Sequence, residues 1–307
     1  MEDSRRPRIR PAIRSQVVIL ILALGWIPVA AQGTTFTWWG ADGEILSFQS
    51  PSDVEAFLET AQVLQVEGID KGITHPKRLL LEKDGIRMHA IFRTLNEFKG
   101  VWHAPSGTKV NFRDSCFYEL AAYRLSRLLG IDRVPPVVER TFVRGDFRAG
   151  REFGKLREAR KGTLQAWVEG AMTEIERRKQ QLRPPDLSAW LAECQRMFLF
   201  DSLTYNEDRN LGNVLIGPDW KIWLIDSTRA FRPFHEPRLP EGIKHCDPAI
   251  WEQFQSLGPE TLRRELKDVL PERVLNCLID RHQALLDHLT RLIAERGDGV
   301  IYALARR

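Results

Sequence analysis

Residues 205–231 read YNEDRNLGNVLIGPDWKIWLIDSTRAF, and this stretch decides the fold of the chain. Asp208 stands in a polar loop directly after residues 187–205, whose apolar periodicity predicts one long amphipathic helix. Asn213 follows five residues later and opens a short apolar strand, and Asp226 closes a second short strand thirteen residues further on. Because a Gly-Pro-Asp turn joins the two strands, we expect a hairpin that brings the side chains of Asn213 and Asp226 together at one end.

This arrangement suits phosphoryl transfer, which needs a divalent metal to neutralise the phosphates and a group to orient the attacking hydroxyl. Magnesium or manganese prefers oxygen ligands, so Asn213 and Asp226 are the predicted metal ligands. Asp208 would face the acceptor hydroxyl, and Asp208 and Asn213 have the D-x-x-x-x-N spacing of the protein-kinase catalytic loop. The competing interpretation is local, because Asn, Asp and Gly are ordinary turn formers between a helix and a strand.

The patterns on either side of this stretch divide the chain into two halves. A strand-rich first half with one strong helix precedes a helix-rich second half, so we predict a two-lobed α+β layout with a boundary near residues 166–172. The predicted strands are 78–82, 87–93 and 163–168, with a further strand to which residues 134–138 lead. The predicted helices are 53–64, 117–129, which Gly130 should stop, 187–205 and most of the chain from about residue 247.

The first 31 residues have the pattern of a targeting segment. A basic stretch precedes the apolar run VVILILALGW at 17–26, and Val29 and Ala31 occupy the positions that a signal peptidase prefers before its cut. The run is shorter than the roughly 20 residues of a membrane span. We therefore predict a signal peptide or membrane anchor over 1–31 and export of the rest to the periplasm, the exterior or a secretory lumen. An uncleaved anchor or a buried helix is the alternative, and we expect no other transmembrane span.

Composition excludes some other classes of function. The formal net charge of +4 comes largely from arginines in the first fourteen residues, so charge indicates no nucleic-acid partner. The four cysteines include no C-x-x-C pair, which argues against a zinc or redox site, and their spacing leaves any disulfide pairing open.

Several segments resemble a known group of atypical kinases. FDSLTYNEDRNLGNVLI (200–216), followed by WLIDSTRAF (223–231), resembles the catalytic region of type II phosphatidylinositol 4-kinases. It is also similar to the secretory-pathway (Golgi casein-kinase-like) kinases, the HipA-like kinases and actin-fragmin kinase. TLQAWVEG (163–170) resembles the hinge of the lipid kinases, and FYELAAYRL (117–125) resembles the secretory-kinase helix with the ion-pairing glutamate. The resemblance implies a protein-kinase-like fold with an N-lobe over 32–166 and a C-lobe over 167–307.

The resemblance also implies a role for each matched position. Asp208 matches the catalytic aspartate, Asn213 and Asp226 match the metal ligands, and Glu119 matches the glutamate that pairs with the phosphate-binding lysine. The implied adenine contacts lie in the hinge around Gln165, Trp167 and Val168. The glycine-bearing turn at 68–74 is implied to cover the phosphates.

One position departs from the family. Arg93 stands where the family has its lysine, and a planar guanidinium is larger and differently directed than an ammonium group. We expect Arg93 to hold phosphate oxygens and to pair with Glu119. A solvated strand end and a catalytically poor site are the alternatives.

The expected function is an ATP-dependent phosphotransferase that uses magnesium or manganese and moves the γ-phosphate to a hydroxyl acceptor. The preferred acceptor is a protein, and a lipid or a sugar stays open. The sequence is also compatible with three other functions. Arg93 and the absence of Asp-Phe-Gly favour a nucleotide-binding pseudokinase or scaffold. The hinge favours a phosphatidylinositol kinase, and a kinase-like fold can also transfer a nucleotidyl group.

Overall fold

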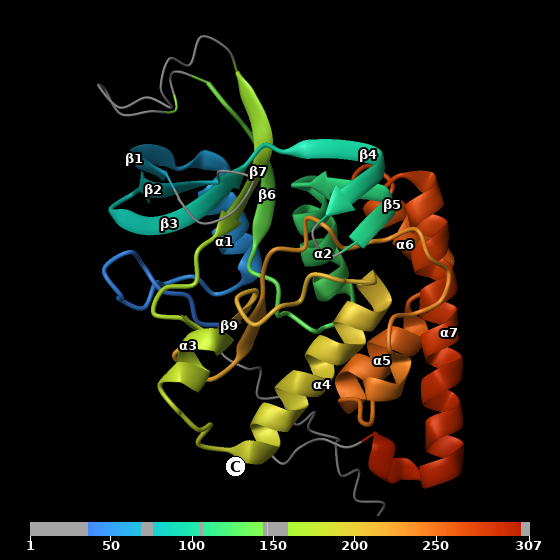
Figure 1. Cartoon of the computed structure of the whole chain (residues 1–307). Coiled ribbons are helices and arrows are strands. Elements are labelled where there is room, and N and C mark those ends of the chain that lie inside the picture. Colours follow the sequence, from blue (N-terminus) through green and yellow to red (C-terminus); the bar gives the residue numbers. More distant parts are fainter. Residues whose placement is uncertain (1–35, 69–75, 105–106, 144–145, 147–158, 302–307) are drawn as a thin grey trace, which may run out of the picture. The chain divides into compact units, whose positions relative to one another are not determined.

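Residues 36–68, 76–104, 107–143, 146 and 159–301 are described by the computed structural model of the chain (Figure 1). They belong to one unit that begins at Phe36. The predicted signal peptide or anchor over 1–31 lies outside the described residues. So does the predicted phosphate-covering turn, of which only Gly68 is described, as the last residue of a strand.

A five-stranded antiparallel sheet in the order β1-β2-β3-β7-β6 forms most of the first half (Figure 1). Its strands alternate, so that Met88, Ala90 and Phe92 of β3 are buried on one face. An amphipathic helix, α1, covers this face with apolar side chains that include Phe57. These elements are α1 (Pro51–Thr60), β1 (Gln62–Gly68), β2 (Lys77–Lys83), β3 (Ile86–Arg93), β6 (Val137–Phe142) and β7 (Arg160–Ala166).

The opposite face of the sheet carries polar side chains. His89, Ile91 and Arg93 alternate with the buried residues of β3, and Ile91 pairs with Gln165 of β7, which places Gln165 on the same face as Arg93. The β2–β3 turn at Asp84 and Gly85 has φ values of 52° and 80°, the left-handed pair that a two-residue hairpin requires.

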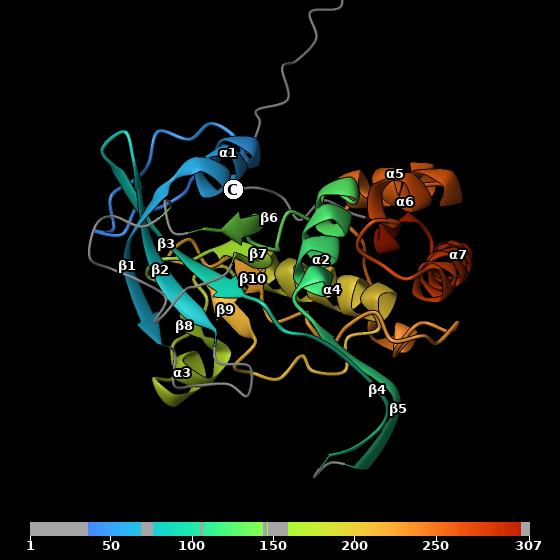
Figure 2. The same cartoon turned by 90° about the horizontal axis from the view of Figure 1, so that it is seen from above.

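A separate two-stranded hairpin, β4 (Asn96–Ala104) and β5 (Gly107–Ser115), follows β3 and extends away from the five-stranded sheet (Figure 2). Its second strand runs directly into helix α2 (Phe117–Leu128), with only Cys116 between them. Gly130, at a φ of +63°, directly follows the C-cap residue Leu129, so the helix ends one residue before the predicted end. The sequence patterns predicted no strands between residues 96 and 115.

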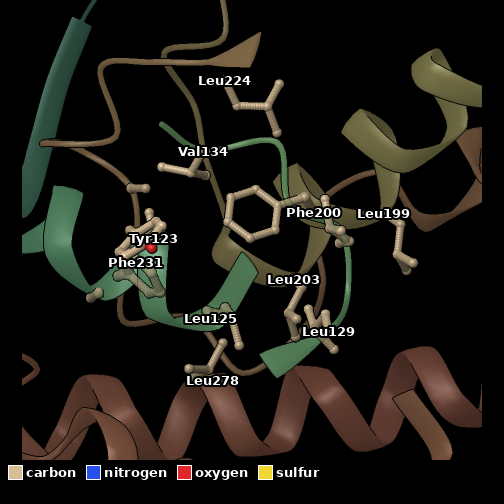
Figure 3. Packing of buried hydrophobic residues seen from close by; sticks show 14 of the residues in the cluster. Tyr123, Leu125, Leu129, Val134, Leu199, Phe200, Leu203, Leu224, Phe231 and Leu278 are labelled. Carbon is tan, nitrogen blue, oxygen red and sulfur yellow. The ribbon is translucent and has the colours of Figure 1, made fainter. Parts of the chain in front are cut away.

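The second half is built on helices that pack around α2. Figure 3 shows Leu125 of α2, Phe200 and Leu203 of α4 and Leu278 of α7 in one buried cluster. Truncating one such leucine to alanine typically costs about 2–5 kcal/mol. The helices are α3 (Glu174–Lys179), α4 (Leu187–Thr204), α5 (Pro248–Ser256), α6 (Pro259–Leu266) and α7 (Glu272–Arg296), with short 3-10 turns η2 (Pro240–Gly242) and η3 (Asp298–Val300).

Three short strands form a second sheet. The order β10-β9-β8 forms a small antiparallel sheet, in which β9 and β10 are the hairpin predicted from the decisive stretch. Helix α4 ends just before it, where Tyr205 adopts a left-handed backbone with φ 48°. The strands are β8 (Met172–Thr173), β9 (Val214–Ile216) and β10 (Ile222–Leu224).

Two element predictions were wrong in part. The helix predicted over 53–64 ends at Thr60, because Ala61 is extended and Gln62 already pairs with β2 as the first residue of β1. The strand predicted over 163–168 is shifted, because β7 begins at Arg160 and ends at Ala166. The strand to which residues 134–138 lead is β6, which begins at Val137, directly after two prolines that have no N–H to donate to a neighbouring strand.

Two further observations bear on the class of protein. Among the described helices, none has both the length and the apolar character to cross a membrane. All four cysteines are free thiols, and burial raises the pKa of Cys194 to about 11 and that of Cys246 to about 12. The position of the lobe boundary at residues 166–167 stays a prediction.

Candidate active site

The loop between α4 and β9 is held by a buried arginine, Arg209. Its Nε and Nη2 each lie 3.0 Å from the carboxylate of Asp201 on α4. Its Nη1 donates to the carbonyl of Asn213 at 2.8 Å and to the carbonyl of Ile225 at 2.6 Å. One guanidinium thus joins the helix, the loop and both strands of the hairpin, which gives the loop a single conformation. Sequence reasoning missed this role, although Arg209 directly follows Asp208.

Asp208 and Asn213 are brought together inside this loop. The side-chain amide nitrogen of Asn213 donates to the carbonyl of Asp208 at 2.8 Å, and the backbone N–H of Asp208 donates to Asn206 at 2.9 Å. The amide oxygen of Asn213 is therefore the atom left for a cation. The carboxylate of Asp208 remains one-third exposed, as a group that meets a substrate has to be.

Asp226 ends the hairpin in a left-handed backbone conformation, with φ 59°. Such a φ is uncommon outside glycine and is tolerated best by Asp and Asn. The next residue, Ser227, donates its backbone N–H to the carboxylate of Glu119 at 3.0 Å. This hydrogen bond connects the turn at Asp226 to the first turn of α2.

Glu119 is completely buried, and its Oε2 has no hydrogen-bond partner among the described residues. Burial raises the pKa of this carboxyl to about 7; the positive charge of Arg93 opposes the increase and the negative charge of Asp226 adds to it. An unsatisfied carboxylate oxygen near Asp226 fits a neighbouring cation.

Arg93 lies on the polar face of the sheet and is 9% exposed. Its Nη1 donates to the side-chain oxygen of Gln165 at 3.1 Å, and the other Gln165 atom, Nε2, has no partner in the described residues. Although Arg93 lowers the pKa of Glu119 through its charge, no direct ion pair joins these two described side chains. The structure thus places Arg93 near Glu119 but pairs it with Gln165.

The other two hinge residues differ in which of their groups remain available to a ligand. Trp167 donates its backbone N–H to the carbonyl of His89 at 3.0 Å, and its ring lies 4.8 Å below the guanidinium of Arg78. The side chain of Val168 is buried in the core between the sheet and α1. Only the backbone of Val168 is therefore left for contact with a base, whereas the side chain of Gln165 contacts the arginine of the site.

A second arginine, Arg229, lies beside the carboxylate of Asp208. Its Nη1 is 3.4 Å from Asp208 Oδ2, and its Nε donates to Asp114 of β5 at 2.7 Å. The guanidinium also lies over the rings of Trp102 and Phe112, at 5.5 Å and 5.7 Å. Asp114 and the two rings belong to the β4–β5 hairpin. They hold the guanidinium of Arg229 in the position from which it orients Asp208. The position of Arg229 three residues after a predicted metal ligand was the only sequence signal for it.

The donor set fits a magnesium or manganese ion of the kind that nucleotides carry. The available atoms are the amide oxygen of Asn213 and the carboxylates of Asp226 and Glu119, all hard oxygens. The described residues contain no group of three or more His, Cys, Asp or Glu that could hold a metal by themselves. Few protein ligands are expected where phosphate oxygens and water complete the coordination.

Comparisons with known proteins find similarity at the level of the fold. No family model matches the sequence, and no curated protein matches it. A solved structure of hydra Fam20 with sugar matches with a TM-score of 0.58 and 15% identity, over 82% of this chain and 91% of that one. The Golgi casein kinase matches with a TM-score of 0.57 and 14% identity, over 82% and 78%. The same kinase with Mn and ADP bound gives 0.56 and 14%, with the same coverage.

These matches define the fold as that of a protein kinase in two lobes. More narrowly, the chain has the fold of the Fam20 and Golgi casein kinases. The predicted two-lobed α+β, protein-kinase-like fold is confirmed. The buried apolar residues form two clusters, one between the sheet and α1 and one among the helices, and the second includes α2 from the first half of the sequence.

Proposed function

We propose that this protein is an ATP-dependent phosphotransferase that uses magnesium or manganese and phosphorylates a hydroxyl group, on a protein in preference to a lipid or a sugar. The observation that carries the proposal is the loop clamped by Arg209, which holds Asn213 against Asp208 within the hairpin that ends at Asp226. The kinase fold supports the same class of reaction, and a structure with that fold contains Mn and ADP.

Each polar group of the site has a task in this proposal. The oxygens of Asn213 and Asp226 hold the metal, which would neutralise the negative charge of the phosphates. Asp208 accepts the proton of the acceptor hydroxyl as that oxygen bonds to the γ-phosphorus, and ADP leaves with the electrons of the broken bond. Arg93 and Gln165, joined on the polar face of the sheet, contact phosphate oxygens, and the hinge backbone at Val168 contacts the base.

The proposed location and domain plan follow from the sequence. Residues 1–31 are a signal peptide or anchor, 32–166 form the N-lobe and 167–307 form the C-lobe. The Golgi casein kinase has the same fold, and its location in the Golgi supports export of this chain as well. A lumen or compartment that contains ATP is the location in which the proposed reaction could proceed.

The test is transfer of labelled γ-phosphate from Mg·ATP or Mn·ATP by the full-length protein to casein, with release of phosphate measured in parallel. Turnover should disappear in Asp226→Ala and persist in Asp219→Ala, because Asp219 lies at the other end of the same hairpin and binds Lys221. Equal turnover in both variants would exclude the proposed centre.

One observation favours a second candidate, a nucleotide-binding pseudokinase. Arg93 is paired with Gln165, and Glu119 has no direct cationic partner among the described residues. If ATP raises the melting temperature of the protein and no phosphate is released or transferred, the pseudokinase is the correct assignment. Transfer of AMP would leave the γ-phosphate label in the released pyrophosphate, and a mass spectrum of the target would show the larger added mass.

A further inference from the structure

A cavity of about 170 Å³ lies beside the proposed catalytic centre and contains none of its residues. It is formed by the base of the β4–β5 hairpin, the first turn of α2, the segment 230–233 and the start of α7. Its apolar walls are Phe98, Phe231, Pro233, Pro271 and Val274. A cavity of this size with such walls accepts a group comparable to a benzene ring.

The polar lining of this cavity is cationic. The described residues that line it include Arg113, Arg232 and Arg273 and no aspartate or glutamate. Arg232 is already engaged with the carbonyls of Asn111 and Val110, at 3.0 Å and 2.8 Å. The other two arginines have no carboxylate partner within the described part of the chain.

All three arginines keep unused hydrogen-bonding capacity, but the Nε of Arg232, buried without a hydrogen bond, lies 3.6 Å from the carboxylate of Glu207. The Nε of Arg113 is buried without a partner, and its Nη2 donates to the uncharged side chain of Asn96 at 3.1 Å. Arg273 is exposed and makes no hydrogen bond or ion pair to any described residue. It also stands in the first turn of a 25-residue helix, where a positive charge is unfavourable unless an anion lies close by.

Tyr118 supplies an independent indication of a ligand. The residue is 2% exposed and lines the cavity, yet its hydroxyl has no hydrogen-bond partner in the described residues. The Arg113 guanidinium lies 5.8 Å from the centre of its ring. The charges of Arg113 and Arg232 both act on this hydroxyl, so an anionic acceptor in the cavity would complete its hydrogen bonding.

The N-terminus of α7 adds backbone donors. Pro271 caps this helix without any side-chain hydrogen bond, and the only acidic residue of the first turn, Glu272, is paired with Arg263. The first N–H groups of a helix favour a negative charge. Hydroxyl, guanidinium and backbone donors therefore all come from residues that line this cavity or from the start of the helix beside it.

We propose that this cavity binds a small amphipathic anion, a phosphate or carboxylate group attached to a flat apolar body, with the anionic end between Arg113, Arg273 and Tyr118. The apolar body contacts Phe231 and Val274 at the far wall, and Phe98, which is 63% exposed, covers it from the rim. This binding does not depend on phosphoryl transfer, since no residue of the proposed metal site takes part.

The experiment is calorimetric titration of the full-length protein with phenyl phosphate. One saturable site is expected, and Arg273→Gln and Arg113→Gln should each weaken binding by about tenfold or more, because each removes a charged hydrogen bond. Arg291→Gln, an exposed position further along α7, should leave the affinity unchanged. Absence of saturable binding, or unchanged affinity in Arg273→Gln, overturns the proposal.

Two further titrations separate this cavity from other sites. Phenyl phosphate should bind more tightly than inorganic phosphate and than benzyl alcohol, and equality with either one would refute the combination of an anionic and an apolar half. Binding should persist in Asp226→Ala and in the presence of ATP. Displacement by ATP would place the anion in the nucleotide site and would refute the new site. The proposed kinase function would not be affected by that result.

Discussion

Replacing Glu119 by glutamine should stabilise the protein at alkaline pH and change its stability little in acid. Glutamine keeps an oxygen to accept the hydrogen bond from the Ser227 N–H, which lies 3.0 Å away, and carries no charge at any pH. Glu119 is fully buried, and burial first of all raises its pKa from 4.5 to about 7. The folded protein therefore holds this proton more tightly than the unfolded chain does.

The sign and size of the effect follow from these two pKa values. The stability that the protonated carboxyl contributes is complete below pH 4.5 and is lost as the pH rises through about 7. The difference between the two pKa values corresponds to about 3 kcal/mol of unfolding free energy. For a chain of this size that is a difference in melting temperature of about 6–12 °C.

The assay is thermal unfolding of the full-length protein and the Glu119→Gln variant without nucleotide, from about pH 5 to about pH 8. The advantage of the variant should grow across this range and level off above neutrality. Glu260→Gln is the matched control, because Glu260 occupies the first turn of α6 and is exposed. A gap of constant size at every pH would refute the argument, since it would not come from the titration of Glu119.

Three other predictions concern the catalytic loop and the sheet. Asp208→Asn should lower phosphate transfer by about 100-fold or more while ATP still raises the melting temperature, measured by labelled transfer and thermal shift. Arg209→Gln should cost about 3–5 kcal/mol in urea unfolding, because Asp201 would be left buried without its cation; a loss below 1 kcal/mol would contradict this. Gly162→Ala should destabilise the sheet by about 1–3 kcal/mol, because a methyl group there would lie 2.2 Å from a carbonyl oxygen of β3, and unchanged urea unfolding would contradict that crowding.

Local sequence patterns were sufficient to predict the elements that carry the residues of the proposed site. The hairpin that ends at Asp226 could be predicted because two apolar strands flank a Gly-Pro-Asp turn, and α2 could be predicted because its periodicity stops at Gly130. These features depend on neighbours in sequence. The register that brings Asn213 beside Asp208 follows from the same short stretch.

The parts that could not be predicted depend on contacts between distant residues. The β4–β5 hairpin has exposed residues on both strands, so its sequence lacks the alternation that marks a half-buried strand. The pairing of Arg93 with Gln165 results from two strands, β3 and β7, that lie next to each other only in the folded sheet. Arg229 likewise reaches Asp114 across 115 positions of sequence.

The direct passage from β5 into α2 makes the hairpin useful as a spectroscopic reporter. With only Cys116 between strand and helix, no flexible linker can absorb a rotation of either one. Val110 is 52% exposed on the hairpin, so it can carry a spin label without disturbing the core. A second label on α4 would then convert any reorientation of the helix that bears Glu119 into a measurable change of distance.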